Sequence, residues 1–171
     1  DYPLKMHVFN RARLIKNSKN RIPYGVDLIQ KYKRESWIVF TENKKQAKEF
    51  NKIINTKGFK SALYNTDLDS AERLENLNKF KKADLNVLVT CTALDEGFDM
   101  PEADGALILS ASSSKRQRVQ RMGRVLRITE NKPNALIVTV YSSKTEFDKL
   151  MEEAKRYHKE GVPVSWKRQD R

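Results

Sequence analysis

The chain alternates between short apolar runs and longer stretches in which apolar residues recur every three or four positions. The first run, residues 37–41, consists of β-forming residues, and the stretch after it has helical spacing that stops at Gly58. The apolar members of that stretch are Ala47, Phe50, Ile53 and Ile54. The pattern predicts a strand, then a helix, then a helix end.

The same alternation repeats along the rest of the chain. Further strands are predicted at residues 61–65, 85–91, 105–110 and 134–141. A helix with an aspartate or serine cap is predicted over 69–82, with Leu74, Leu77 and Phe80 facing inward. A last helix is predicted over about 144–157, and its apolar side carries Phe147, Leu150 and Met151.

The predicted strands are apolar throughout, which is typical of strands that helices cover on both faces. Their alternation with helices predicts an α/β fold with a doubly wound, mostly parallel sheet of about five or six strands. Residues 1–36 are interpreted as lead-in helices, with Pro23 near a helix start, and residues 159–171 as a short basic tail. The region 37–158 is then the α/β domain, and its candidate ligand sites are the loops that follow the strands.

Composition narrows the class of partner. With 171 residues, the chain suits one domain, and 34 Lys and Arg against 22 Asp and Glu give a net charge of +12. This charge favours phosphate-bearing partners, of which nucleic acid is the commonest, although the lysines are spread along the whole chain. Because the chain starts at Asp1 rather than at methionine, we expect it to be part of a longer polypeptide or a processed product.

Several classes of site and location are excluded by what the sequence lacks. Cys91 is the single cysteine and His7 and His158 stand alone, so we expect neither a disulfide nor a metal site. No charged-then-apolar leader and no apolar run of about 18 residues occurs, which predicts an intracellular protein, cytoplasmic or nuclear, without a membrane partner. Neither GxxxxGK[ST] nor GxGxxG is present, so this chain has no phosphate cradle of its own.

The loop after the third predicted strand, residues 90–101, concentrates polar chemistry. Asp95, Glu96 and Asp99 fit either a solvated acidic turn or a pair of catalytic carboxylates. A third interpretation is that the hydroxyls of Thr90 and Thr92 donate to backbone phosphates while Asp99 accepts from a ribose hydroxyl.

Residues 120–127, QRMGRVLR, form what we call the arginine ladder. On a helix, its arginines face away from the apolar side, as in a solvated basic face. Two features speak against that interpretation. No acidic residue occurs from Lys115 to Arg127, so the arginines have no i,i+4 partner. The rigid guanidinium of arginine also suits bidentate contact with phosphate, and Gly123, which has no side chain, lets another surface approach Arg124.

Four segments together resemble the C-terminal RecA-like motor domain of superfamily 2 helicases. IVFTEN resembles motif IV, and the stretch from YNTDLDSAER to the strand NVLVT resembles the next segment of that family. LDEGFDMP resembles motif V and QRMGRVLR resembles motif VI, QxxGRxxR. The resemblance covers residues 37–141, and the wording LDEGxDxP is closer to XPB-like and restriction-enzyme-type motors than to DEAD-box proteins.

The resemblance implies a role toward ATP, which with Mg²⁺ is held mainly by an N-terminal RecA-like domain. Arg124 and Arg127 match the arginine fingers of the family, and Gln120 matches a residue at the closed interface. The neighbouring Arg121 is assigned to the same nucleotide-facing set. The motif V positions that approach the nucleotide are Gly97 and Asp99.

The resemblance also implies contact with the nucleic-acid backbone, with DNA favoured over RNA. Asn43 and the Cys91–Thr92 pair match contact positions, although Cys91 stands where many relatives have a hydroxyl residue. Thr90 is added to the set because its hydroxyl, or that of Thr92, can compensate for the one missing at Cys91. Thr66 is assigned to the same set, in a turn where Asn65 and Thr66 replace the usual His-Gly pair.

The sequence therefore predicts the second motor domain of an ATP-dependent helicase or translocase, inactive without a P-loop domain. Two alternatives stay open: a basic nucleic-acid-binding module without catalysis, and an activator that donates Arg124 to a separate ATPase.

Overall fold

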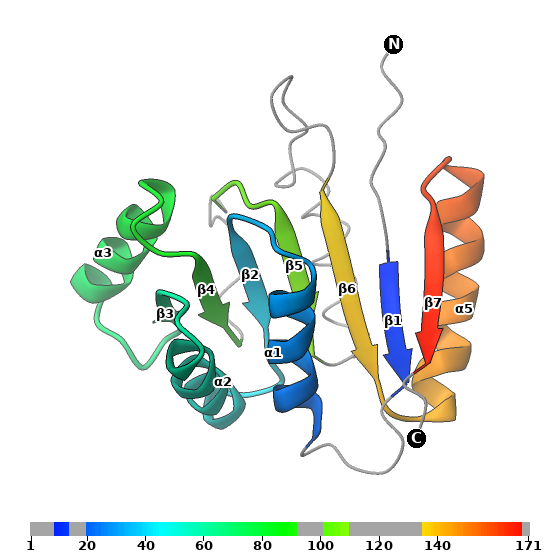
Figure 1. Cartoon of the computed structure of the whole chain (residues 1–171), viewed down its shortest axis with the longest axis horizontal. Coiled ribbons are helices and arrows are strands. Elements are labelled where there is room, and N and C mark those ends of the chain that lie inside the picture. Colours follow the sequence, from blue (N-terminus) through cyan, green and yellow to red (C-terminus); the bar gives the residue numbers. More distant parts are fainter. Residues whose placement is uncertain (1–8, 14–19, 92–100, 110–134, 169–171) are drawn as a thin grey trace.

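The computed structural model describes residues 9–13, 20–91, 101–109 and 135–168. Its strands are β1 (Phe9–Arg13), β2 (Trp37–Phe40), β3 (Ser61–Tyr64), β4 (Val87–Thr90), β5 (Gly105–Ile108), β6 (Leu136–Tyr141) and β7 (Val164–Arg168). Its helices are α1 (Arg21–Lys31), α2 (Lys44–Thr56), α3 (Ser70–Lys81) and α5 (Lys144–Lys159). The described strands form one seven-stranded sheet in the order β3-β4-β2-β5-β6-β1-β7, and every neighbouring pair is parallel (Figure 1). The predicted α/β class and parallel sheet are confirmed.

Local signals in the sequence set the helix ends. Asn43 caps α2 by accepting a hydrogen bond from the Gln46 N–H, and α2 is followed by Gly58 at a φ of 85°. Asp69 caps α3, so the aspartate of the two predicted caps is the one used. Ser143 and Glu146 form a capping box at the start of α5, in which each side chain binds the other residue's backbone N–H.

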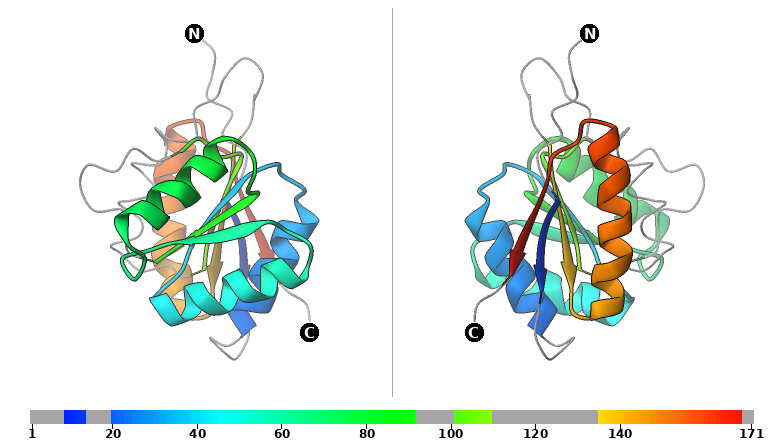
Figure 2. Two further views of the ribbon diagram at one scale, coloured as in Figure 1. Left: turned by 90° about the vertical axis from the view of Figure 1, so that its left-hand side faces the viewer. Right: turned by 90° about the vertical axis from the view of Figure 1, so that its right-hand side faces the viewer.

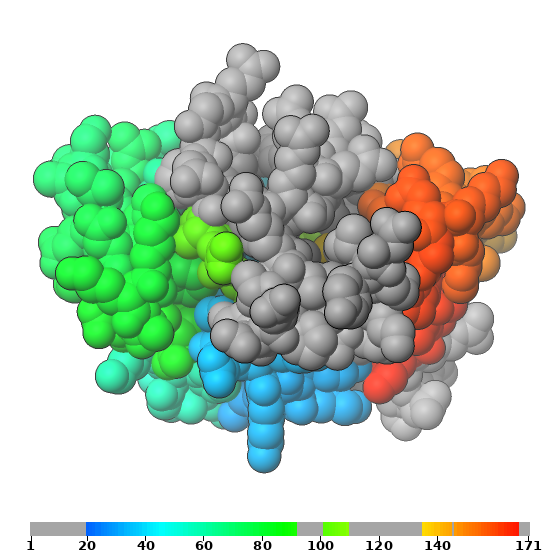
Figure 3. All heavy atoms as spheres, turned by 90° about the horizontal axis from the view of Figure 1, so that it is seen from above, coloured from blue at the N-terminus to red at the C-terminus, as the bar shows by residue number. Residues whose placement is uncertain are grey.

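Helices cover both faces of the sheet (Figure 2). Trp37 and Val39 of β2 belong to a core cluster with residues of α1 and α2, whereas Ile38 and Phe40 belong to a second cluster with residues of α3 and α5. This alternation is the period of two that a strand imposes on its side chains. Apolar residues are therefore needed at every position of such a strand, and the doubly wound arrangement is confirmed. Viewed from the amino ends of the strands, α3 and α5 lie at opposite ends of the molecule (Figure 3).

One glycine is required by close packing across the sheet. Gly105 pairs with Trp37 in register, and a Cβ placed on Gly105 would lie 2.6 Å from the indole ring, which is itself fully buried. Trp37 thus fills the core because β5 begins without a side chain opposite it.

The two chain ends and one helix face differ in part from the predictions. The expected lead-in helix with Pro23 near its start is present as α1, with Pro23 in its first turn, but the segment 1–36 also contains the strand β1, between β6 and β7. The supposed tail contributes β7, so the described sheet has seven strands rather than five or six. Leu74 was expected to face inward but is 57% exposed, because α3 meets the core only through Leu77 and Phe80.

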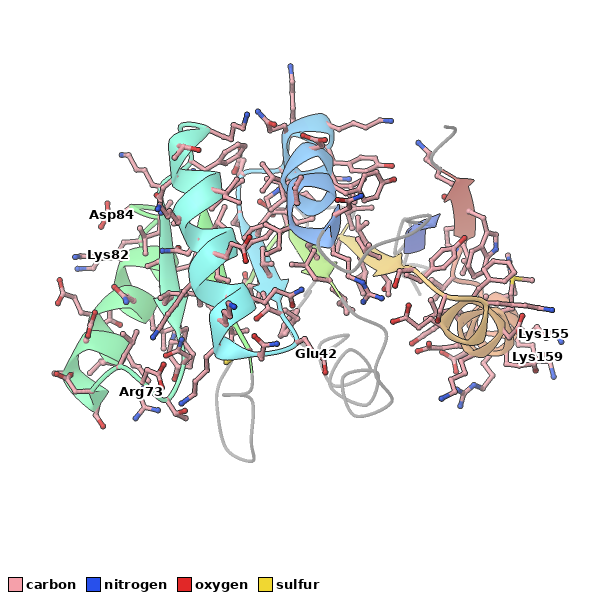
Figure 4. All side chains as sticks on the ribbon, turned by 90° about the horizontal axis from the view of Figure 1, so that it is seen from below. Glu42, Arg73, Lys82, Asp84, Lys155 and Lys159 are labelled. Atoms are coloured by element: carbon pink, nitrogen blue, oxygen red, sulfur yellow. The ribbon has the colours of Figure 1, made fainter. Side chains whose placement is uncertain are left out.

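The carboxyl ends of four strands are level with one another. Tyr64, Thr90, Phe40 and Ile108 end β3, β4, β2 and β5 in one row of paired residues, and the row continues to Thr139, two residues before the end of β6. We call the side of the sheet just beyond this row the carboxyl edge; it is at the bottom of Figure 1 and faces the viewer in Figure 4. Among the described residues, no helix is long and apolar enough to cross a membrane.

Candidate functional site

Buried polar side chains gather at the carboxyl edge. Thr41 follows β2, Thr90 ends β4 and Asn65 follows β3, and each is at most 2% exposed. The Thr41 N–H donates to the Thr90 carbonyl at 2.9 Å, which fastens the ends of β2 and β4 together. Among the described residues, neither the Thr90 hydroxyl nor the Asn65 Nδ2 has a hydrogen-bond partner. Because buried polar groups are normally paired, two such donors on neighbouring strands suit a ligand rich in acceptors.

Asn65 is also fixed within its own turn. Its Oδ1 accepts a hydrogen bond from the Asp67 N–H at 3.0 Å, and its carbonyl accepts from the Leu68 N–H at 3.4 Å. Asn65 therefore organises the turn after β3. Thr66, the predicted contact, is exposed beside it.

The remaining described contact candidates differ in what their side chains can offer. Asn43 is exposed, and its Oδ1 is engaged in capping α2, at 2.9 Å from the Gln46 nitrogen. Cys91 is buried, forms no disulfide and packs in the apolar cluster under α1 and α2. The Cys91 side chain thus lies among core residues, whereas Thr90 beside it has a hydroxyl without a partner.

Two lysines of α2 converge on one carboxylate. Lys44 and Lys48, one helical turn apart, both bind Asp67 in the turn after β3, and the Lys48 Nζ is 3.1 Å from Asp67 Oδ2. Hydrogen bonds from the two ammonium groups lower the pKa of Asp67 below its usual value. The first turn of α2 contains no acidic residue. The carboxylate of Asp67, outside the helix, therefore offsets the positive end of the helix dipole and the charges of the two lysines.

A buried arginine joins three elements at the other half of the carboxyl edge. Arg21, in the first turn of α1, is 7% exposed. Its Nη1 donates to the carbonyl of Leu109, just after β5, at 2.9 Å. Its Nη2 lies 2.7 Å from one carboxylate oxygen of Glu146 on α5 and also donates to the Ser142 hydroxyl just after β6. The end of β5 is thereby tied to the start of α5.

Acidification is expected to weaken the fold through Glu146. Burial raises the pKa of this carboxyl, but hydrogen bonds from Arg21 and Ser142 and the Arg21 charge outweigh it and hold the pKa below the ordinary 4.5. Because the folded-state pKa is depressed, the ionised Glu146 contributes its full stability above pH 4.5 and loses it as the pH falls through the folded-state value. Glu146→Gln should therefore reduce the pH dependence of the free energy of unfolding below pH 4.5, measured by urea denaturation.

Glu152→Gln is the matched control, because Glu152 is exposed on the same helix and pairs with Lys155 one turn away. It should keep the wild-type pH dependence. Identical acid profiles for wild type and Glu146→Gln would contradict the assignment.

The predicted nucleotide-facing residues lie outside the described residues. They are Gly97, Asp99, Gln120, Arg121, Arg124 and Arg127, and the predicted nucleic-acid contact Thr92 also falls there. The structure nevertheless fixes the ends of the two strands that precede their segments, Thr90 of β4 and Ile108 of β5.

Sequence reasoning missed the Arg21 and Asp67 contacts. The Ser143-x-x-Glu146 spacing is a capping-box signature that would have marked the start of α5. The i,i+4 spacing of Lys44 and Lys48 is visible in the sequence as well. Nothing local marks Arg21, because its partners are 88 and 125 residues away.

Comparison with known proteins agrees with this arrangement. Residues 20–129 match the model of the helicase conserved C-terminal domain. The fold is similar to the C-terminal domain of the DEAD-box protein Dbp5, with a TM-score of 0.79 over 97% of this chain and 91% of that one at 18% identity. A structure of S. cerevisiae Dbp5 bound to RNA and ADP BeF3 is similar over 99% of this chain and 43% of that one, with a TM-score of 0.75 at 17% identity.

Among curated proteins, the DNA 3'-5' translocase XPB2 of Sulfurisphaera tokodaii is 36% identical over 75% of this chain and 28% of its own length. The UvrABC system protein B of Fusobacterium nucleatum is 31% identical over 69% of this chain and 19% of its own. The ATP-dependent rRNA helicase RRP3 of Scheffersomyces stipitis is 26% identical over 69% of this chain and 24% of its own. The chain thus spans less than a third of the length of these relatives. The match and the parallel sheet lead to one conclusion: the chain belongs to the helicase conserved C-terminal domain family, as a RecA-like domain of superfamily 2.

Proposed function

We propose that this chain is the second motor domain of an ATP-dependent nucleic-acid helicase or translocase. An N-terminal RecA-like domain of the same polypeptide would hold ATP and Mg²⁺, and Arg124 and Arg127 would reach that nucleotide as arginine fingers. Arginine suits this role because its planar fork binds phosphate oxygens in pairs. We infer that the domain runs from β1 to β7, because the sheet includes strands on both sides of residues 37–158.

The observation that carries the proposal is the level row of strand ends. Phe40 on β2 pairs with Thr90 on one side and with Ile108 on the other. In sequence, the motif V segment follows Thr90 and the segment with the arginine ladder follows Ile108, so the chain enters both segments from strand ends that flank β2. Such adjacency would let one conformational change act on nucleotide and nucleic acid together.

Contact with the nucleic-acid backbone is proposed for the β3, β4 and β2 end of this edge. The unpartnered Thr90 hydroxyl and Asn65 Nδ2 would donate to phosphate or sugar oxygens. Asn43, Thr66 and Thr92 are proposed to add contacts from the neighbouring loops. DNA is favoured as the track because the relative with 36% identity is named a DNA translocase.

The proposed cycle uses closure and reopening of two domains. When the N-terminal domain with bound ATP closes on this one, the guanidinium groups of Arg124 and Arg127 stabilise charge on the phosphoryl group in transfer. Reopening after hydrolysis shifts the backbone contacts of the two domains relative to each other, which moves the protein along its track.

Asp67→Asn is expected to strengthen nucleic-acid binding by the full-length protein. Asp67 balances Lys44 and Lys48 beside the proposed contacts, so its neutralisation frees two cations for phosphate. The dissociation constant should fall several-fold, and the salt dependence should steepen by roughly one unit for each phosphate gained. Fluorescence anisotropy across a salt series measures both quantities.

Glu75→Gln is the matched control, because Glu75 pairs with Lys79 one turn along α3 in an exposed ion pair. It should leave the affinity and the salt slope unchanged. Weaker binding by Asp67→Asn would mean that Asp67 organises the contact surface rather than competing with phosphate.

ATPase assays of the full-length protein test the proposal as a whole. Turnover should rise with at least one of four stimulants, namely single-stranded DNA, double-stranded DNA, branched DNA and RNA, and the isolated chain should show none. Absence of nucleic-acid-stimulated turnover, together with retained binding, would favour the binding module. Stimulation of a separate ATPase by the isolated chain would favour the activator.

A further inference from the structure

The position of Arg21 is not explained by the stability of its own helix. It lies in the first turn of α1, where the helix dipole disfavours a positive charge, and that turn contains no acidic residue of its own. Its guanidinium is nevertheless buried, and its Nε has no partner within the structure. The burial of this charge at a helix start is unfavourable by itself, so its explanation must lie in the residues that the Arg21 side chain contacts.

Arg21 binds the residue that precedes the segment 110–134. Leu109 is the residue at which the chain leaves β5, and the arginine ladder begins eleven residues later in sequence. Ser142 follows β6, the strand into which the same segment returns. Because β5 and β6 are parallel, the segment returns at Leu136, at the opposite edge of the sheet. Arg21 therefore fixes the end at which the segment leaves β5, and its contact with Ser142 holds that end beside the end of β6.

The chemistry of the contact favours a geometric role over a stabilising one. A guanidinium can donate to the Leu109 carbonyl with one nitrogen and to the Glu146 carboxylate with another, in directions that its plane fixes. A lysine has no such fork. Buried ion pairs often contribute little net stability compared with apolar residues of the same volume, because desolvation offsets their attraction.

We propose that Arg21, oriented by Glu146, is a positioning residue that sets where the arginine ladder leaves the sheet. This inference rests on the proposed function. Arg21 does not touch the nucleotide in this proposal; it acts by holding the Leu109 carbonyl. A small displacement there would carry over to Arg124, and a misplacement of about 1 Å at a reacting group costs on the order of 10²-fold in rate.

The test uses the full-length protein and nucleic-acid-stimulated ATP hydrolysis. Arg21→Met should lower kcat by about 10-fold to 10²-fold with less than about a threefold change in KM for ATP. Arg21→Lys keeps the charge without the fork and should lie between. Adding Glu146→Gln to Arg21→Met removes the unpaired carboxylate, so it should recover stability in urea while kcat stays low. Recovery of kcat together with stability would overturn the inference.

A double-mutant cycle identifies the residue through which Arg21 acts. In a protein that already carries Arg124→Ala, Arg21→Met should cause almost no further loss of kcat, because Arg21 acts by positioning the Arg124 guanidinium. If the fold-losses in kcat of the two single variants multiply in the double variant, the inference is overturned. Ile54→Val, a change in the α2 core expected to cost about 0.5–1.5 kcal/mol, is the control for stability and should leave kcat unchanged. Absence of nucleic-acid-stimulated turnover by the unmodified full-length protein would reject the proposed function itself, whereas normal turnover by Arg21→Met in an active protein would reject only this inference.

Discussion

Replacing Arg124 by alanine in the full-length protein is expected to lower ATP turnover about 10³-fold or more. The reason is that a guanidinium supplied from the second domain neutralises charge that develops only in the transition state. Since the ladder pattern turns Arg124 away from the apolar side of its predicted helix, the fold should be retained. Steady-state ATPase assays with saturating nucleic acid, together with a thermal melt, measure both parts of the prediction.

Arg156→Ala is the matched control, because it also removes one arginine. Arg156 is exposed in the last turn of α5, and this helix lies at the opposite end of the molecule from α3 (Figure 3). Its replacement should leave turnover within about twofold of wild type, as for surface changes distant from a site. Near-normal turnover by Arg124→Ala would mean that the finger assignment is wrong.

Trp37→Ala is expected to destabilise the domain by about 3–5 kcal/mol. The indole is fully buried against Gly105, in the core between the sheet and the helices α1 and α2. A loss of this size is a large part of the roughly 5–15 kcal/mol that keeps a domain folded. Urea denaturation followed by far-UV circular dichroism measures it without depending on tryptophan fluorescence.

The chain offers a matched tryptophan on the last strand. Trp166 of β7 is only partly buried, next to Phe147 and Tyr141, so Trp166→Ala removes the same atoms from a more exposed site. Its cost should be clearly smaller. Equal costs at the two positions would show that burial against Gly105 does not determine the effect.

The elements between Trp37 and Tyr141 that the structure describes were predictable because their signals are local. The strand β2 is apolar at every position and β4 is apolar up to Thr90, and Asp69 and Gly58 mark helix ends through their own backbone preferences. The strand signals are reliable because helices cover both faces of the sheet, so successive strand residues are buried. The face of α3 was mistaken at Leu74 because the packing of neighbours, which no local pattern contains, decides which residues meet the core.

The two strands that were missed have sequences that resemble surface segments. β1 reads FNRAR and β7 reads VSWKR, so neither has the continuous apolar run of the central strands. Their pairing with each other joins residues about 155 positions apart, for example Phe9 with Val164. Single-sequence periodicity cannot report pairing over such a separation.

The candidate site was predictable to the extent that its residues lie in ordered motifs. The assignments of Arg124, Arg127, Gly97 and Asp99 stay predictions. The contacts of Arg21 could not be read from the sequence, because a buried arginine at a helix start looks like any exposed one until its partners on β5 and α5 are known.

The placement of β1 has a consequence for the order of folding. The strands β3, β4, β2 and β5 all come from the contiguous stretch between Trp37 and Ile108, so their pairings close short loops. The other half of the sheet is different, because β1 lies between β6 and β7 and joins the two ends of the chain. Kinetically, the first half should form as a nucleus and the second as a late closure, in which the last strand has no edge to pair with until the first strand is in place.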